Sequence, residues 1–159
     1  MRRSHGHLIV YRPGWLHRGT WRAGQTNGAL FVIQLSVLLA CLTRGLDYLR
    51  RDSDPTSVLS RVQDSAPLAA WGAMFVAAVV VVAIGLIGRW GVLVGVGHII
   101  AGLAYAGIAY GLFLVTHLGP GVRTPMGLAV AAAAHGALGI GTFAILRRRE
   151  ELQHPSTPT

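Results

Sequence analysis

GVLVGVGHIIAGLAYAGIAYGLFLVTHL, residues Gly91 to Leu118, is the stretch of sequence that decides the fold of this chain. It is a long apolar run that carries one internal histidine, His98. A helix rises about 1.5 Å per residue, and roughly 20 apolar residues cross a hydrocarbon core of about 30 Å. The stretch is therefore long enough to span a membrane, even when it is tilted.

The composition places the rest of the chain in the same class. Of its 159 residues, 52% are hydrophobic and only 13% are charged, a mixture that excludes an ordinary water-soluble domain. All 14 basic residues are arginine, and the formal net charge is +8. These arginines flank apolar runs, where they meet lipid headgroups, so we expect them to set topology and not to bind nucleic acid. The single cysteine, Cys41, excludes an internal disulfide.

Three further apolar stretches complete a membrane domain over residues 29–146. The four spans are predicted at about residues 29–49, 67–88, 91–118 and 126–146. Only Arg89 and Trp90 separate the second span from the third, so these two helices must be antiparallel neighbours. The predicted fold class is an all-α membrane protein, an antiparallel four-helix transmembrane bundle.

The first span carries its polar and small residues on one side. Gln34, Cys41 and Tyr48 fall on a common stripe that should face other helices, and Arg44 is expected to reach toward the interface in a structural role. Leu38 to Cys41 also resembles the lipobox of a bacterial lipoprotein, in which the cysteine is lipidated. The charged region before this run is longer than a usual signal peptide and three spans follow, so we prefer a span with an inert thiol.

Small residues mark the predicted helix contacts of the third and fourth spans. Glycine and alanine let helices approach closely in lipid, so a stripe of them indicates a buried face. In the third span the stripe also holds Tyr105, and Leu103 lies on its opposite side. The predicted packing positions are Gly91, Gly95, Gly102 and Ala109, a second contact at Gly107 and Gly111, and Ala131 and Gly139 beside His135 in the fourth span.

Arginine and tryptophan mark where the chain meets the membrane surface. Residues 1–28 form a basic, aromatic segment, either interfacial or disordered, and residues 147–159 form a basic and then disordered tail. The triplet Arg147 to Arg149 is expected to stop the last helix at the surface. The predicted interface anchors are Trp15, Trp21, Trp71, Trp90, Arg147, Arg148 and Arg149.

The arginine distribution also predicts the orientation. With four spans, nine of the 14 arginines lie on the side of the two termini and five on the other side. Cytoplasmic loops carry the excess of basic residues, so both termini are predicted to lie in the cytoplasm and the protein in the cell membrane.

His98 and His135 are the deep ionisable groups, with Gln34 and Tyr105 as further buried polar candidates. Counted from the helix ends, His98 lies about 10 Å deep and His135 about 16 Å deep. Three interpretations stay open: a structural hydrogen bond, a proton path, or axial ligation of a haem. We favour the first, because one histidine per helix among small residues is weak evidence of a ligand. No catalytic set, metal cluster or cofactor motif occurs, so enzymatic activity, a metal and a cofactor are not expected.

A resemblance to a group of proteins is carried by three features of the chain: arginine without lysine, the segment SAPLAAWGAMF at residues 65–75, and RRREE at residues 147–151. These features are similar to small four-span membrane proteins, mostly of unknown function, of actinobacteria and their phages. Among phage proteins, holins have a similar outline. The resemblance implies a non-enzymatic, holin-like or accessory membrane protein whose partners are the lipid bilayer and a homo-oligomer or larger membrane complex. A bis-histidine haem protein for electron transfer is the alternative.

Overall fold

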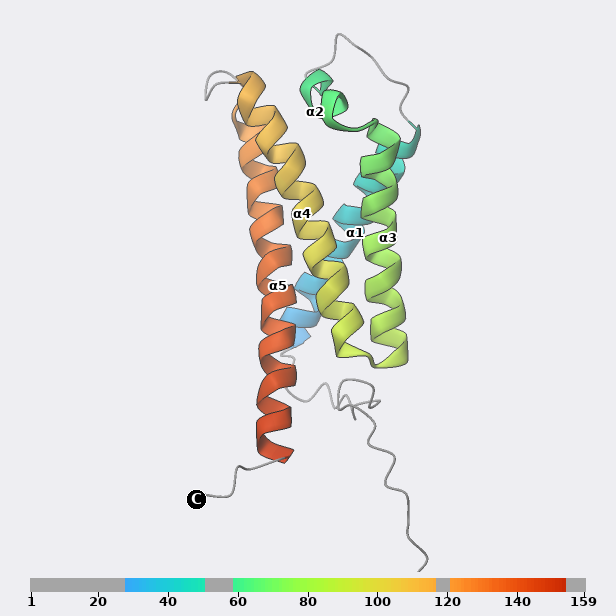
Figure 1. Cartoon of the computed structure of the whole chain (residues 1–159), viewed down its shortest axis with the longest axis vertical. Coiled ribbons are helices and arrows are strands. Elements are labelled where there is room, and N and C mark those ends of the chain that lie inside the picture. The colour runs from blue at the N-terminus through green and yellow to red at the C-terminus, as the bar shows by residue number, and fades with distance from the viewer. Residues whose placement is uncertain (1–27, 51–58, 117–120, 154–159) are drawn as a thin grey trace, which may run out of the picture.

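A computed structural model of the chain describes residues 28–50, 59–116 and 121–153. Within these ranges every element is a helix: α1 (Gly28–Arg50), α2 (Ser60–Ser65), α3 (Leu68–Gly88), α4 (Gly91–Thr116) and α5 (Arg123–Gln153). Four of them, all except the short α2, are long and apolar enough to cross a membrane, and they pack into one bundle (Figure 1). The all-helical class and the four long apolar helices are thereby confirmed.

The helix bounds agree closely with the predicted spans except at the last helix. The α5 helix begins at Arg123 and continues through the arginine triplet to Gln153, so the prediction that the triplet stops the helix is wrong. Arginine, glutamate and leucine are good helix formers, and Arg147 pairs with Glu151 one turn on, at 3.2 Å between Nε and Oε1. Residues 117–118 of the predicted third span, the segment 1–27 with Trp15 and Trp21, and residues 154–159 lie outside the described residues.

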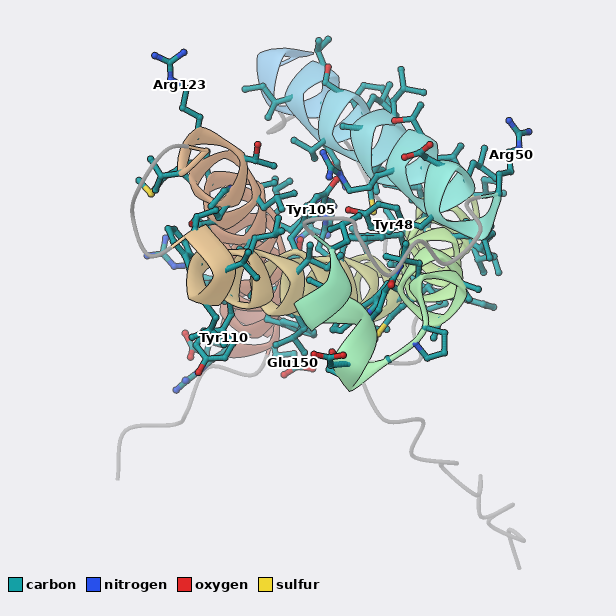
Figure 2. The ribbon with its side chains drawn as sticks, turned by 90° about the horizontal axis from the view of Figure 1, so that it is seen from above. Tyr48, Arg50, Tyr105, Tyr110, Arg123 and Glu150 are labelled. Atoms are coloured by element: carbon teal, nitrogen blue, oxygen red, sulfur yellow. The ribbon has the colours of Figure 1, made fainter. Side chains whose placement is uncertain are left out.

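The α4 helix is the centre of the bundle. It packs most extensively against α5 and then against α3, while α1 packs mainly on α3 and only sparingly on α5. Figure 2, which looks along the bundle, shows α4 and α5 crossing each other, with α1 beside this pair. The polar residues described below lie in the space that these three helices enclose.

The turn between α3 and α4 is closed by backbone hydrogen bonds. Arg89 adopts the left-handed conformation at φ 59°, the N–H of Trp90 donates to the Gly85 carbonyl at 2.8 Å, and that of Arg89 to the Leu86 carbonyl at 3.3 Å. This pattern satisfies the last carbonyls of α3 in the way that glycine-capped helices do. It lets α4 begin only two residues after α3 ends.

Glycine at helix contacts explains how closely the long helices approach. A Cβ placed on Gly97 of α4 would lie 2.5 Å from Val82 Cγ2 and 2.8 Å from the Ala78 carbonyl oxygen of α3. A Cβ on Gly72 of α3 would lie 2.8 Å from the Gly45 carbonyl oxygen of α1. Because apolar side chains gain nothing by leaving lipid, such close backbone packing is a main source of helix association in membranes.

Candidate functional site

The centre of the candidate site is a pair of touching histidines. His98 on α4 and His135 on α5 are both fully buried, and their Nδ1 atoms lie 2.9 Å apart. Gly102 lies one turn beyond His98 on α4 and faces His135 of α5. A Cβ added to this glycine would lie 3.6 Å from the Cβ of His135. The two imidazoles therefore bridge the offset of about 6 Å in depth that the helix positions imply. One ring nitrogen must donate a hydrogen to the other, because two lone pairs do not bond.

Gln34 of α1 extends this pair into a chain across three helices. Its side-chain Nε2 lies 3.1 Å from His98 Nε2. If the amide nitrogen donates there, His98 carries its proton on Nδ1 and donates it to His135 Nδ1, which leaves His135 protonated on Nε2. A flipped amide reverses every donor and acceptor in the chain. In both cases these two contacts pair both ring nitrogens of His98 and Nδ1 of His135 away from water.

His135 Nε2 is the open end of this chain. It is buried and makes no hydrogen bond to a described residue. Its protonation depends on the Gln34 amide at the other end of the chain: Nε2 carries a proton if the amide nitrogen donates to His98, and it carries none if the amide is flipped.

Tyr105 connects the histidines to an arginine nearer the end of the bundle. Its ring is only 3% exposed and stacks on the His135 ring, with centroids 5.5 Å apart and an interplanar angle of 21°. It also packs against Phe75, with ring centroids 4.7 Å apart. The Arg44 guanidinium lies 5.8 Å from the Tyr105 ring centroid and 6.0 Å from that of Tyr48. Such cation–π geometry holds a cation at low desolvation cost.

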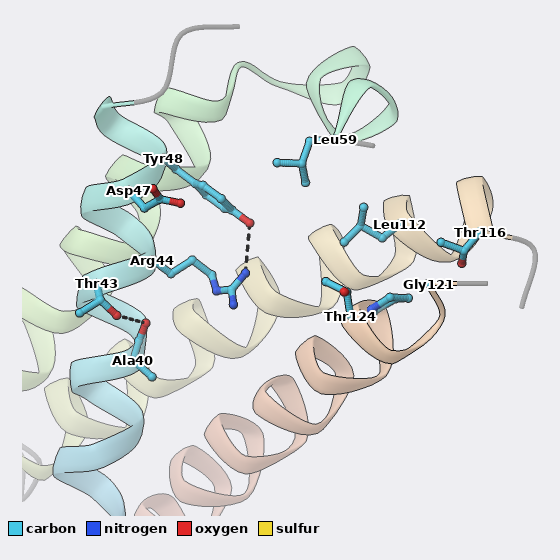
Figure 3. A pocket seen from close by; sticks show the side chains of 11 residues that line it. Ala40, Thr43, Arg44, Asp47, Tyr48, Leu59, Leu112, Thr116, Gly121 and Thr124 are labelled. Atoms are coloured by element: carbon cyan, nitrogen blue, oxygen red, sulfur yellow. Dashed lines mark hydrogen bonds between the residues drawn. The ribbon is translucent and has the colours of Figure 1, made fainter. Parts of the chain in front are cut away.

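A cavity of about 680 Å³ opens above Arg44, where α1 and α4 end and α5 begins. In Figure 3, Arg44 points from α1 into this space, and Thr124 and Gly121 lie opposite it. Arg44 donates a hydrogen bond from Nη1 to the Tyr48 hydroxyl at 3.3 Å. We call this space the Arg44 cavity, and it is lined by Ala40, Thr43, Arg44, Asp47, Tyr48, Leu59, Leu112, Thr116, Gly121, Thr124 and Pro125.

The predicted packing positions of the third and fourth spans lie at helix contacts. Each of the following glycines has a neighbouring side chain within 2.9 Å of where a Cβ would stand: Gly91 meets Leu146, Gly95 meets Phe143, Gly107 meets Trp71, Gly111 meets Val62, and Gly139 meets Ile99. Ala109 is 3% exposed, and Ala131 is half-buried against the core. The polar candidate Gln34 is 7% exposed.

The described anchor residues have different surroundings. Trp90 is 40% exposed, and Arg147 and Arg148 are exposed at the end of α5, with Arg149 half-buried. Trp71 is half-buried, its ring faces Gly107 of α4, and its Nε1 is buried without a hydrogen-bond partner among the described residues. Trp71 is therefore part of the α3–α4 contact as well as near a helix end.

Sequence reasoning missed the inward direction of Arg44 and the close contact at Gly97. Arg44 and Tyr48 are four residues apart, the spacing at which helical side chains meet, and Tyr48 lies on the predicted buried stripe. That spacing was the available signal. Gly97 is adjacent to His98 but not on its stripe, so only the position of α3 on another side of α4 identifies it as a packing residue.

The chemistry that these groups offer is polar binding inside an apolar bundle. The described residues bring together two imidazoles, an amide, two phenols and one guanidinium, and they contain no group of three or more histidine, cysteine or acidic side chains suited to a metal ion. Comparison of the chain with protein-family models, with curated proteins and with solved structures gives no match.

Proposed function

We propose that the chain is a non-enzymatic, multi-pass integral protein of the cell membrane that acts as an accessory subunit. The observation that supports this most is the distribution of polarity in the long helices. Their buried polar side chains bond to one another, as in the chain from Gln34 through His98 to His135, while their exposed faces carry large apolar residues such as Leu39 and Val130. This is the distribution expected of a bundle that has lipid as its solvent.

The same proposal includes an antiparallel order of the four spans with both termini in the cytoplasm. The tight turn at Arg89 and Trp90 supports opposite directions for α3 and α4. The excess of arginine on the side of the termini supports the orientation.

An accessory subunit is favoured over a hole-forming holin. A hole between copies of the chain needs helices with a polar outer face that can line water. Within the described spans, Ser36, Thr43 and Tyr110 are exposed and carry hydroxyl groups. The hydroxyls of Ser36 and Thr43 already donate to carbonyls of their own helix, Val32 at 2.8 Å and Ala40 at 3.0 Å, and the exposed faces are otherwise largely apolar. Such outer faces are suited to contact with lipid or with another apolar helix.

The haem alternative is not supported by the histidine geometry. Two axial imidazoles on one metal ion hold their ligating nitrogens about 4 Å apart, since each bond is about 2 Å long. The nearest ring nitrogens of His98 and His135 are 2.9 Å apart and share a hydrogen. A haem between them would have to break this bond and separate α4 from α5.

Two measurements test the proposal. The chain should stay in the membrane fraction after a carbonate wash, and reporter fusions should place a C-terminal fusion after Thr159 inside and a fusion within residues 52–60 outside. Expression of the chain alone should leave the membrane potential of the host intact. Release by carbonate would refute membrane integration, an external C-terminus would refute the orientation, and collapse of the potential would favour the holin-like function.

A further inference from the structure

We propose that the Arg44 cavity binds the phosphodiester headgroup of a membrane phospholipid. Its volume of about 680 Å³ is within the range of roughly 300–1,000 Å³ of small-molecule pockets. The inference rests on the proposed membrane location and adds a ligand to it. Three observations support it. The arginine is held in place by neighbouring rings, a threonine hydroxyl in the cavity wall has no hydrogen-bond partner among the described residues, and part of the wall is apolar at the depth where headgroups meet acyl chains.

The cation is Arg44, which is held in place before any ligand arrives. Its guanidinium lies over the rings of Tyr48 and Tyr105 and donates to the Tyr48 hydroxyl. The two tyrosines are neutral, so these contacts orient the positive charge without neutralising it. A guanidinium presents several N–H donors in one plane, a geometry that matches the oxygens of a phosphate group.

Threonine hydroxyl groups line the cavity together with this cation. Thr116 and Thr124 line the cavity from α4 and α5, and the Thr116 hydroxyl oxygen is buried without a hydrogen-bond partner among the described residues. A buried hydroxyl with no partner is costly, and a phosphate oxygen is an acceptor that would satisfy it. The carboxylate of Asp47 in the cavity wall repels anions, and it disfavours a doubly charged phosphate monoester more than a phosphodiester, which carries a single negative charge.

The position of the cavity favours a lipid over a soluble anion. Arg44 lies six residues before the end of α1 at Arg50, about 9 Å along the helix axis. The headgroup layer extends roughly 5–8 Å beyond each side of the hydrocarbon core, so this distance places Arg44 near the boundary between headgroups and acyl chains. Ala40, Leu112 and Pro125 give the cavity an apolar wall, and α1 contacts α5 only sparingly, so acyl chains have access beside it.

The test uses the full chain purified in detergent and dioctanoyl phosphatidylglycerol as the probe, with bound lipid counted by native mass spectrometry and binding followed by thermal shift. Arg44→Gln removes the charge. Arg50→Gln and Arg123→Gln are matched controls, because both arginines are exposed and point away from the bundle (Figure 2). We expect the Kd to rise about tenfold or more in Arg44→Gln and by less than about twofold in the controls.

Two further ligands separate the possible sources of binding. Dioctanoylglycerol has the same chains without the phosphate, and inorganic phosphate has the anion without the chains. The proposal requires that both bind at least about tenfold more weakly than the phospholipid. Equal binding of dioctanoylglycerol would show a purely apolar groove, and equal binding of inorganic phosphate would show a site for a soluble anion. Either result would overturn the proposal.

A structural defect is distinguished from a lost contact by a second variant. Thr124→Val keeps the shape of an exposed side chain at the cavity wall and removes its hydroxyl, so it should fold with an unchanged melting temperature in the absence of lipid. It should weaken binding severalfold. If Thr124→Val and Arg44→Gln both bind as the parent does, or if the control arginines matter equally, the cavity is not the site. A chain that fractionates with the membrane yet fails these tests would retain the proposed function and lose only the ligand.

Discussion

Replacing Gly97 with alanine tests the close packing of α3 on α4. The new Cβ would lie 2.5 Å from Val82 Cγ2, 2.8 Å from the Ala78 carbonyl oxygen and 3.0 Å from the Val82 backbone nitrogen. Carbon atoms in contact prefer about 3.5–4.0 Å. Two of the three neighbours are backbone atoms, which cannot rotate away, so α3 as a whole must move away from α4.

The expected magnitude follows from two opposing terms. Extra volume in a well-packed interior costs about 1–3 kcal/mol, and the backbone contacts put Gly97→Ala in the upper half of that range. Alanine in place of glycine gains about 1 kcal/mol of helix propensity. We therefore expect the free energy of unfolding to fall by about 1–2 kcal/mol.

Gly141→Ala is the matched control, because a Cβ on this exposed glycine of α5 has no atom within 4 Å. It should raise the free energy of unfolding by about 0.5–1 kcal/mol through helix propensity alone. Unfolding in SDS, followed by tryptophan fluorescence, measures both variants, and Trp71 reports on the interface directly because it packs on Gly107. If Gly97→Ala is as stable as Gly141→Ala, the close approach of α3 and α4 is refuted.

Three further predictions concern α4 and the histidines. Gly102→Leu should destabilise the protein in detergent, because even a Cβ at this position would lie 3.3 Å from a carbonyl oxygen of α5. Leu103→Ala should be as stable as the parent, because the Leu103 side chain is 65% exposed. If Leu103→Ala were the destabilising change instead, α4 would present its other face to the bundle. His98→Leu and His135→Leu should each cost about 1–2 kcal/mol, and the double variant should cost roughly 0.5–2 kcal/mol less than their sum, whereas additive costs would argue against direct contact. Protein purified from haem-sufficient cells should be colourless, and a Soret band lost in both His98→Ala and His135→Ala would instead favour electron transfer.

The sequence predicted the four long apolar helices well because a helix that could cross a membrane follows a simple rule. A span must be apolar for about 20 residues, and small residues must lie where helices meet, so periodicity locates both. The C-terminal end of α5 was harder to predict, because arginine and glutamate readily form helix in water as well. The helix therefore continues past Arg149 although the apolar run has ended.

The candidate site was only partly predictable, for a reason that lies in helix register. The sequence places His98 and His135 on the sides of their helices that carry small residues. The sequence of one helix does not show how far the neighbouring helix is shifted along the bundle axis. The contact at 2.9 Å depends on how α4 and α5 are shifted against each other. The direction of Arg44 depends likewise on Tyr105, which belongs to a different helix.

The chain from Gln34 to His135 supplies the register that apolar packing leaves open. Apolar faces distinguish poorly between neighbouring helices and lipid tails, so apolar packing holds α1 mainly through its close approach to α3 at Gly45 and Gly72. Rotating α1 by one residue would turn the Gln34 amide away from His98 and toward hydrocarbon, where it has no partner. Because α1 contacts α5 only sparingly, this hydrogen-bonded chain and the contact of Arg44 with Tyr105 are the polar links described between α1 and the other two helices. Both links need the same placement of α1 against α4, so the buried histidines and the Arg44 cavity depend on one arrangement of three helices.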